Sequence, residues 1–171
     1  MSDDPNAGPR SGIRQVIDGR PISGNASASR TFRRSLATVA QHPRVVDPGH
    51  PLIERVRAIC FELPEVVEVE AWGRPTFRAA KPIFVHVSAS MERPLSIVLK
   101  TDPDEHLALT QDGRFFGPPY YDRDRWVGVD LDQPDTDWQL LAELIETSYR
   151  QVANRRQLQA LDALRPEHTG G

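Results

Sequence analysis

Apolar residues recur at three- and four-residue intervals directly after Pro51, and this spacing predicts an amphipathic helix. Proline suits the first position of a helix because the N–H that it lacks would have no partner there. Pro64 ends the pattern. The apolar positions of the predicted helix are Leu52, Val56, Ile59, Cys60 and Leu63.

A period of two follows and predicts four consecutive strands. These strands span about residues 67–72, 76–79, 82–88 and 95–100. The run Gly73-Arg74-Pro75 predicts a tight turn between the first two strands. Because short connections join strands that run in opposite directions, we expect an antiparallel sheet.

The next segment carries the signals of a short helix. Asp102 is a suitable capping residue, Pro103 suits the first turn, and Glu105 lies where it can reciprocate the cap. The helix is predicted to run through about Asp112, because Gly113 stops it.

One strand and a long helix complete the predicted domain. A loop over residues 115–125 leads to a fifth alternating segment at 126–131. Thr136 and Gln139 predict a capping box for a helix that extends to about Val152, followed by a final turn with Leu158 and Leu161. This order predicts a two-layer α+β fold, with an antiparallel sheet of about five strands and helices packed on one face.

The ends of the chain differ in composition from this domain. Residues 1–49 are rich in Gly, Pro, Ser, Asn and Arg, and their few apolar residues cannot offset the entropy cost of ordering. We therefore predict a flexible basic extension over 1–49, an ordered domain over 50–165 and a disordered tail over 166–171. The basic run at 30–36 either docks on an acidic surface or stays solvated.

Charge is distributed unevenly along the chain. Residues 1–50 hold seven Arg against four Asp, a net charge of +3, whereas residues 51–171 hold fourteen basic and twenty acidic side chains, a net charge of −6. Tight wrapping of duplex nucleic acid draws most of its non-specific affinity from phosphate neutralisation. The acidic domain argues against such wrapping and leaves room for a local basic patch.

Composition limits the class of protein. Hydrophobic residues make up 39% of the 171 residues, and no apolar stretch approaches the roughly 20 residues of a membrane-spanning helix. The N-terminal residues lack the apolar core of a secretory signal, and the single Cys60 has no partner for an internal disulfide. These features predict a cytoplasmic protein that does not enter the membrane.

Motifs spread over the ordered region resemble the MmcQ/YjbR family. The resemblance runs from about residue 51 to residue 162 and implies a small domain akin to type III secretion chaperones in fold, often described as DNA-binding-like, with no established reaction. The segments that carry it are 63–65 (Leu-Pro-Glu), 72–77 (Trp-Gly-Arg-Pro-Thr-Phe), Lys81, 99–103 (Leu-Lys-Thr-Asp-Pro), 118–120 (Pro-Pro-Tyr), 126–127 (Trp-Val) and 148–153 (Ser-Tyr-Arg-Gln-Val-Ala).

Period two divides the strand side chains between two faces. The face toward the helices is predicted to hold Val67, Val69, Ala71, Ile83, Val85, Val87, Ile97, Leu99, Val127 and Val129. The opposite face is predicted to hold Trp72, Arg78, Phe84, His86, Ser96, Lys100 and Trp126, together with Glu68 and Glu70.

Aromatic rings beside cations on an exposed sheet suit base stacking, cation–π contact or a protein partner. The alternative is that Phe115, Phe116, Tyr120 and Tyr121 fold back as a lid and convert this face into a second small core.

Two further groups are candidate ligand contacts. Arg74 and Lys81 either flank a hairpin tip that grips an anion or are solvated residues near turns. The segment 117–125, with Tyr120, Tyr121 and Arg123, has the prolines, aromatic rings and charges of a recognition loop and equally of a rigid connection.

The sequence gives little support for catalysis. The five histidines show no ligand spacing, so we expect no metal and no cofactor, and a constellation of His86, Ser96 and Lys100 is the one acid–base group worth testing. We therefore predict a non-enzymatic binding module of the MmcQ/YjbR type, with DNA as the ligand that the resemblance implies. The alternative is a chaperone-like or protein-interaction domain that binds another polypeptide or forms a homodimer.

Overall fold

The structure is a computed structural model, and it describes residues 43–165. The predicted disorder of residues 1–42 and 166–171 lies outside the described residues. Residues 43–49, which were predicted as part of the extension, lie against the domain: the Val45 N–H donates to the Gly73 carbonyl over 3.1 Å, and Val46 is buried in the core. Within the described chain, ordered packing thus starts before Pro51.

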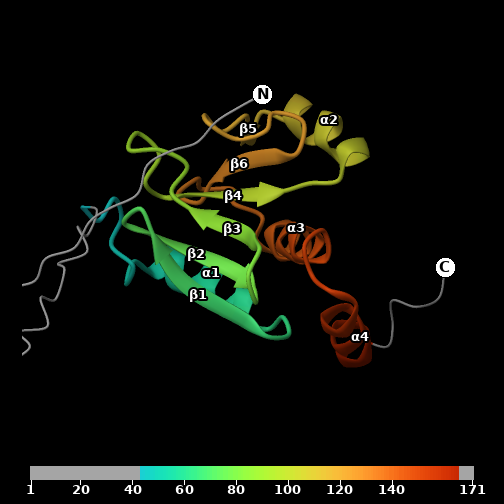
Figure 1. The fold of residues 1–171 in the computed structure, drawn as a ribbon. Helices are drawn as coiled ribbons and strands as arrows, with labels where there is room; N and C mark the ends of the chain where they lie inside the picture. The colour runs from blue at the N-terminus through green and yellow to red at the C-terminus, as the bar shows by residue number, and fades with distance from the viewer. Residues whose placement is uncertain (1–42, 166–171) are drawn as a thin grey trace, which may run out of the picture. The chain divides into compact units, whose positions relative to one another are not determined.

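Six antiparallel strands form one sheet in the order β1-β2-β3-β4-β6-β5 (Figure 1). Their bounds are β1 Val66–Ala71, β2 Arg74–Ala79, β3 Ile83–Val87, β4 Ser96–Lys100, β5 Phe115–Phe116 and β6 Trp126–Asp130. The predicted α+β class and antiparallel order are confirmed. The two-residue β5 lies inside the segment that was predicted as a loop, because a pair of residues is too short to show a period.

Four helices accompany the sheet, and Figure 1 shows α1 and α3 behind the same face of it. Their bounds are α1 Pro51–Phe61, α2 Pro103–Gln111, α3 Trp138–Arg150 and α4 Arg155–Leu164. α3 packs on β3 and β4, α1 on β1 and α3, and α2 lies beside β5 and β6. The segment predicted as a final turn is the ten-residue helix α4.

The main core lies between the sheet and the helices α1 and α3. Completely buried side chains from the strands meet completely buried side chains from both helices there. These include Phe77, Val85, Ile97, Leu99 and Val127 from the sheet and Ile53, Val56, Cys60, Ile145 and Tyr149 from the helices. Helices on one face leave the other face of the sheet for the functional site.

The two faces of β1 were predicted the wrong way round. Val67 and Val69 are 41% and 39% exposed on the face away from the helices, and Glu68 points toward α1. There Glu68 forms a two-pronged ion pair with Arg57 of α1, at 2.7 and 2.8 Å. A bidentate pair to a covering helix supplies the hydrogen bonds that a half-buried carboxylate needs. Glu68 therefore faces α1, whereas Glu70 of the same strand is exposed.

Phe84 was also assigned to the wrong face. The pairing of β2 with β3 shifts between Phe77 and Arg78, which leaves Phe84 as an extra, unpaired residue of β3. Such a bulge re-aims side chains. The Phe84 ring accordingly packs edge-to-face on Tyr149 of α3, with centroids 5.4 Å apart.

The predicted positions of the first hairpin turn and of the α3 N-cap were wrong. The first hairpin turns at Trp72 and Gly73, both with positive φ as a two-residue type I′ turn requires, so Arg74 already belongs to β2. The N-cap of α3 is Asp137, whose carboxylate accepts from Gln139 N and Leu140 N. Thr136, the predicted cap, instead donates its hydroxyl to carbonyls of the preceding loop.

Candidate functional site

An aromatic cluster occupies the centre of the sheet face that the helices leave open. His86 of β3 and Trp126 of β6 lie with ring centroids 5.7 Å apart, and Tyr121 packs on both, at 5.2 and 5.5 Å. Tyr121 belongs to the connection between β5 and β6, which folds back over the sheet. Val98 and Thr76 are completely buried beneath this cover, so part of this face is a second small core.

Phe116 extends this cover toward the β5 edge. It pairs with Gly128 across the ladder, and a side chain at Gly128 would collide with the Phe116 ring. Arg93 lies 4.0 Å above the same ring and forms an ion pair with Asp130. Close packing therefore favours glycine at position 128.

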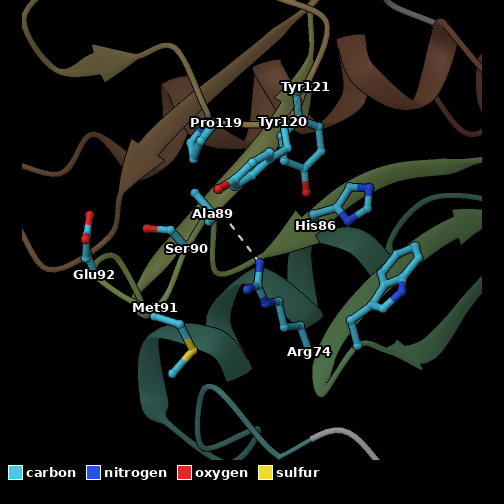
Figure 2. A pocket seen from close by; sticks show the side chains of 10 residues that line it. Arg74, His86, Ala89, Ser90, Met91, Glu92, Pro119, Tyr120 and Tyr121 are labelled. Atoms are coloured by element: carbon cyan, nitrogen blue, oxygen red, sulfur yellow. Dashed lines mark hydrogen bonds between the residues drawn. The ribbon is translucent and has the colours of Figure 1, made fainter.

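A hollow of about 650 Å³ opens beside the aromatic cluster (Figure 2). Three parts of the chain form it: the hairpin tip between β1 and β2, the connection from β3 to β4, and the loop before β6. Figure 2 shows Pro119, Tyr120 and Tyr121 on one side and Arg74 rising from β2 on the other. The lining residues are Trp72, Arg74, His86, Ala89, Ser90, Met91, Glu92, Pro119, Tyr120 and Tyr121.

Arg74 supplies the positive charge of the hollow. Its Nη1 donates to the Ser88 carbonyl over 2.8 Å and to the Ala89 carbonyl over 3.5 Å, which fixes the guanidinium against the β3–β4 connection. Figure 2 shows the bond to Ala89 as a dashed line. The Nε of Arg74 is buried, and it has no hydrogen-bond partner among residues 43–165. A buried donor of this kind costs about 1–3 kcal/mol until it finds an acceptor.

His86 is neutral beside this cation. Burial, reinforced by the charges of Arg78 and Arg74, lowers the pKa of His86 from 6.5 to about 4. Burial also raises the pKa of the Tyr121 hydroxyl. The hollow thus combines the Arg74 guanidinium and uncharged rings with one acidic residue, Glu92, on the β3–β4 connection.

Strained backbone surrounds the hollow. Trp72, Ser88 and Tyr120 all have positive φ, at 53°, 63° and 70°. Non-glycine residues enter this region at a cost and concentrate at ligand-binding sites. Two of the three hold exposed rings at the rim, since Trp72 is 62% exposed and the Tyr120 side chain is fully exposed.

The structure separates several residues that the sequence had grouped. Arg74 is the first residue of β2, and Lys81 follows the end of the same strand, so the two do not flank one hairpin tip. Arg78 lies on the open face beside Thr76, to whose hydroxyl it donates. Lys100 lies across the ladder from Trp126, and neither it nor Arg123 lines the hollow.

The proposed acid–base group is not assembled. His86 pairs with Val98, and Ser96 and Lys100 lie two residues to either side of Val98 on β4. The Ser96 hydroxyl is already used, because it accepts from Ala89 N and donates to Arg93 O. No hydrogen bond joins His86 to Ser96 or Lys100 within the described residues.

Sequence reasoning missed the β3–β4 connection as a wall of the hollow. Ala89, Ser90, Met91 and Glu92 line it, but the segment has no glycine and no chemical motif. Its backbone carbonyls, which hold Arg74, carry no sequence signal. The wall is visible only in three dimensions.

Between residues 43 and 165, no three His, Cys, Asp or Glu side chains are grouped so that they could hold a metal ion. Among the helices that the structure describes, none has the length and hydrophobicity to cross a membrane.

Comparison with known proteins supports the fold and gives a family. The family model described as YjbR matches residues 61–151. The crystal structure of the Deinococcus radiodurans protein DR2400, with a domain described as DUF419, is similar at 24% identity with a TM-score of 0.53. That match covers 64% of this chain and 86% of DR2400, and it shows a shared fold.

A crystal structure of a Pseudomonas syringae protein matches more weakly. Its identity is 15% and its TM-score 0.45, over 52% of this chain and 88% of the other. No curated protein matches the sequence.

Proposed function

Because this chain belongs to the YjbR family, we propose that it is a non-enzymatic binding module and that the hollow beside Arg74 is its ligand site. The observation that supports this most is the hydrogen bonding of the Arg74 guanidinium. The group is fixed by two carbonyls, yet its buried Nε has no acceptor among residues 43–165. A site that holds an unsatisfied cation among aromatic rings favours an anionic ligand with a flat ring.

Single-stranded nucleic acid fits this chemistry. A base can stack on the exposed ring of Trp72 or Tyr120, while a phosphate oxygen accepts from Arg74. Both rings lie on the rim of the same hollow as Arg74. The hollow offers one cation, Arg74, beside the acidic Glu92, and no extended basic stripe. We therefore expect contact with a single phosphate and only a modest dependence on salt.

Fluorescence anisotropy of a labelled oligodeoxythymidylate of roughly a dozen nucleotides tests the proposal, with the full chain at about 50 mM and about 200 mM salt. We expect saturable binding that Arg74→Gln weakens about tenfold or more, since a charged hydrogen bond is lost. Trp72→Ala should weaken binding by a similar factor without touching the core, because the side chain is exposed.

Arg114→Gln is the matched control. It also removes one positive charge, but Arg114 is exposed and pairs with Asp112 away from the hollow. This variant should bind as the unaltered protein does. Absence of saturable binding, or equal losses in Arg74→Gln and Arg114→Gln, would contradict a nucleic-acid site in the hollow.

A second candidate is a chaperone-like function in which the open edge of β1 binds an extended polypeptide or a second copy. β1 is the outermost strand, and the described residues place no strand on its free side. Its exposed face carries Val67 and Val69 next to Trp72. Free strand edges with exposed apolar residues pair readily with another chain.

The double variant Val67→Lys/Val69→Lys separates the two functions. It introduces charge on the β1 face and leaves the lining of the hollow unchanged. Loss of dimerisation in sedimentation, with oligonucleotide binding retained, would favour the protein-interaction function for this surface. A monomer at all concentrations that binds no unfolded polypeptide would contradict it.

A further inference from the structure

We propose that the amino-terminal end of α4, together with Gln157 and Lys81, forms a second binding site that takes a phosphate monoester group. The proposal does not depend on the function of the Arg74 hollow. The residues concerned lie at the β2–β3 turn and the α3–α4 junction, at the opposite end of β2 from Arg74.

A separate hollow of about 290 Å³ marks the place. The β2–β3 turn forms one wall, and the start of α4 with the residues before it forms the other. The lining residues are Ala79, Ala80, Lys81, Pro82, Val152, Asn154 and Gln157. This lining contains no aromatic ring, so the hollow suits a small polar group and offers no surface for base stacking.

Gln157 is the unusual residue of this hollow. Only 1% of it is exposed. Its Oε1 accepts from Asn154 N over 2.9 Å, and the Asn154 Oδ1 accepts from Gln157 N over 3.0 Å in a capping box. Since the capping bond requires an acceptor, the amide oxygen must face Asn154 N. The orientation of the amide is thereby fixed.

The amide nitrogen of Gln157 is left without an acceptor. Gln157 Nε2 and Arg74 Nε are the two buried side-chain donors that lack a hydrogen-bond partner between residues 43 and 165. Each belongs to a residue that lines a hollow. A ligand oxygen at Gln157 would remove a cost of about 1–3 kcal/mol in the free protein.

The surrounding charge favours an anion. α4 is ten residues long and has no acidic residue in its first turn. Its N-cap Asn154 lines the hollow, so the positive end of the helix dipole lies at this place. Lys81 is exposed and forms no ion pair within the described part of the chain. Arg156 of α4 forms an ion pair with Glu65 over 2.7 Å, so this carboxylate already has a cationic partner.

These donors match a tetrahedral oxyanion better than a planar one. The Gln157 amide and the Lys81 ammonium belong to different elements around the hollow, and a phosphate offers a separate oxygen to each. A dianion also gains more than a carboxylate from the helix end and from Lys81 together.

The test is a titration of the full chain, labelled with nitrogen-15, with inorganic phosphate at constant ionic strength. We expect saturable shifts of the amide signals of residues 154–157 and of the Gln157 side-chain NH₂, with a dissociation constant in the millimolar range, about 1 mM. Chloride at equal ionic strength should produce no such shifts.

Two variants remove the proposed contacts without removing the helix cap. Gln157→Glu keeps an acceptor for Asn154 N, as in an ordinary capping box, but loses the NH₂ donor and adds negative charge. Lys81→Gln changes an exposed side chain. Each should weaken phosphate binding at least about tenfold. Lys100→Gln, which removes the other lysine of the chain, is the charge-matched control and should leave phosphate binding unchanged.

Equal shifts in Lys81→Gln and in the unaltered protein would overturn the proposal, as would shifts confined to arginine-rich surfaces elsewhere. Phosphoserine and a 5′-mononucleotide then distinguish the sources of the group, since equal affinities mean that the phosphate alone is recognised. Arg74→Gln should not alter phosphate binding at this site. The phosphate titration and the oligonucleotide assay therefore test the two proposals independently of each other.

Discussion

The hydroxyl of Ser148 in α3 accepts a hydrogen bond from the backbone N–H of Lys100 in β4 over 2.8 Å. The same hydroxyl donates to the carbonyl of Phe84, the bulged residue of β3. One buried helix side chain therefore satisfies two backbone groups that the interrupted ladder leaves without strand partners. The contact joins α3 to the sheet at the position where the sheet is irregular.

Ser148→Ala should destabilise the fold by about 2–4 kcal/mol, because it leaves a buried N–H and a buried carbonyl unsatisfied. Equilibrium unfolding in urea measures the loss. Thr147→Ala is the neighbouring control, since Thr147 is only partly buried and should change the free energy of unfolding by no more than about 0.5 kcal/mol. Equal effects in the two variants would show that the Ser148 bonds contribute nothing.

Gly128→Ala should destabilise the protein by about 1–3 kcal/mol, because the added methyl group must displace the Phe116 ring. A double-mutant cycle with Phe116→Ala checks the cause. Once the ring is gone the methyl group has space, so Gly128→Ala should then cost no more than about 0.5 kcal/mol. An unchanged cost in the Phe116→Ala background would place the strain elsewhere.

Much of the fold could be predicted from sequence, because it depends on local periodicity. The helix after Pro51, the four consecutive strands and the helix capped by Asp102 follow from spacing and capping chemistry that act over a few residues. The MmcQ/YjbR resemblance is likewise confirmed by the YjbR match over residues 61–151. A pattern that lies within one helix or strand can be recognised from the sequence alone, because all the residues that form it are neighbours in the chain.

The incorrect predictions concern side chains whose direction depends on residues far away in the sequence. The alternation of Val and Glu in β1 defines two faces but does not say which one is buried, and Arg57 on another element reverses the expected choice. The bulge at Phe84 changes a side-chain direction that a strict period of two fixes wrongly. Arg74 was predicted as a turn residue, and its role depends on the carbonyls of Ser88 and Ala89, about fifteen residues on.

Cys60, the single cysteine, should be unreactive in the native protein. It is completely buried in α1, and burial raises the pKa of its thiol well above the ordinary value, so the nucleophilic thiolate is scarce. A chromogenic disulfide reagent at about pH 8 should modify native protein at least about a hundredfold more slowly than urea-unfolded protein. The variant Cys60→Ala/Thr110→Cys, with an exposed thiol, should react rapidly without denaturant. Equally fast reaction of Cys60 in the native state would contradict its burial.

His86 should make stability depend on pH in the mildly acidic range. Its folded pKa of about 4 lies below the unfolded value of 6.5, so the unfolded chain binds the proton more readily. The stability is fully present above about pH 6.5 and is lost as the pH falls toward 4, by at most about 3 kcal/mol.

Urea unfolding of the protein and of His86→Gln at several pH values between about 4 and 7 measures this contribution. Carboxylates titrate in both proteins. The difference between the two proteins in the slope of unfolding free energy against pH therefore isolates the contribution of His86. The slope should be shallower in His86→Gln, and the imidazole signal of His86 in the native protein should show no titration near pH 6.5. A midpoint near 6.5, or equal slopes in the two proteins, would mean that water reaches His86 freely and that the Tyr121 cover does not exclude it.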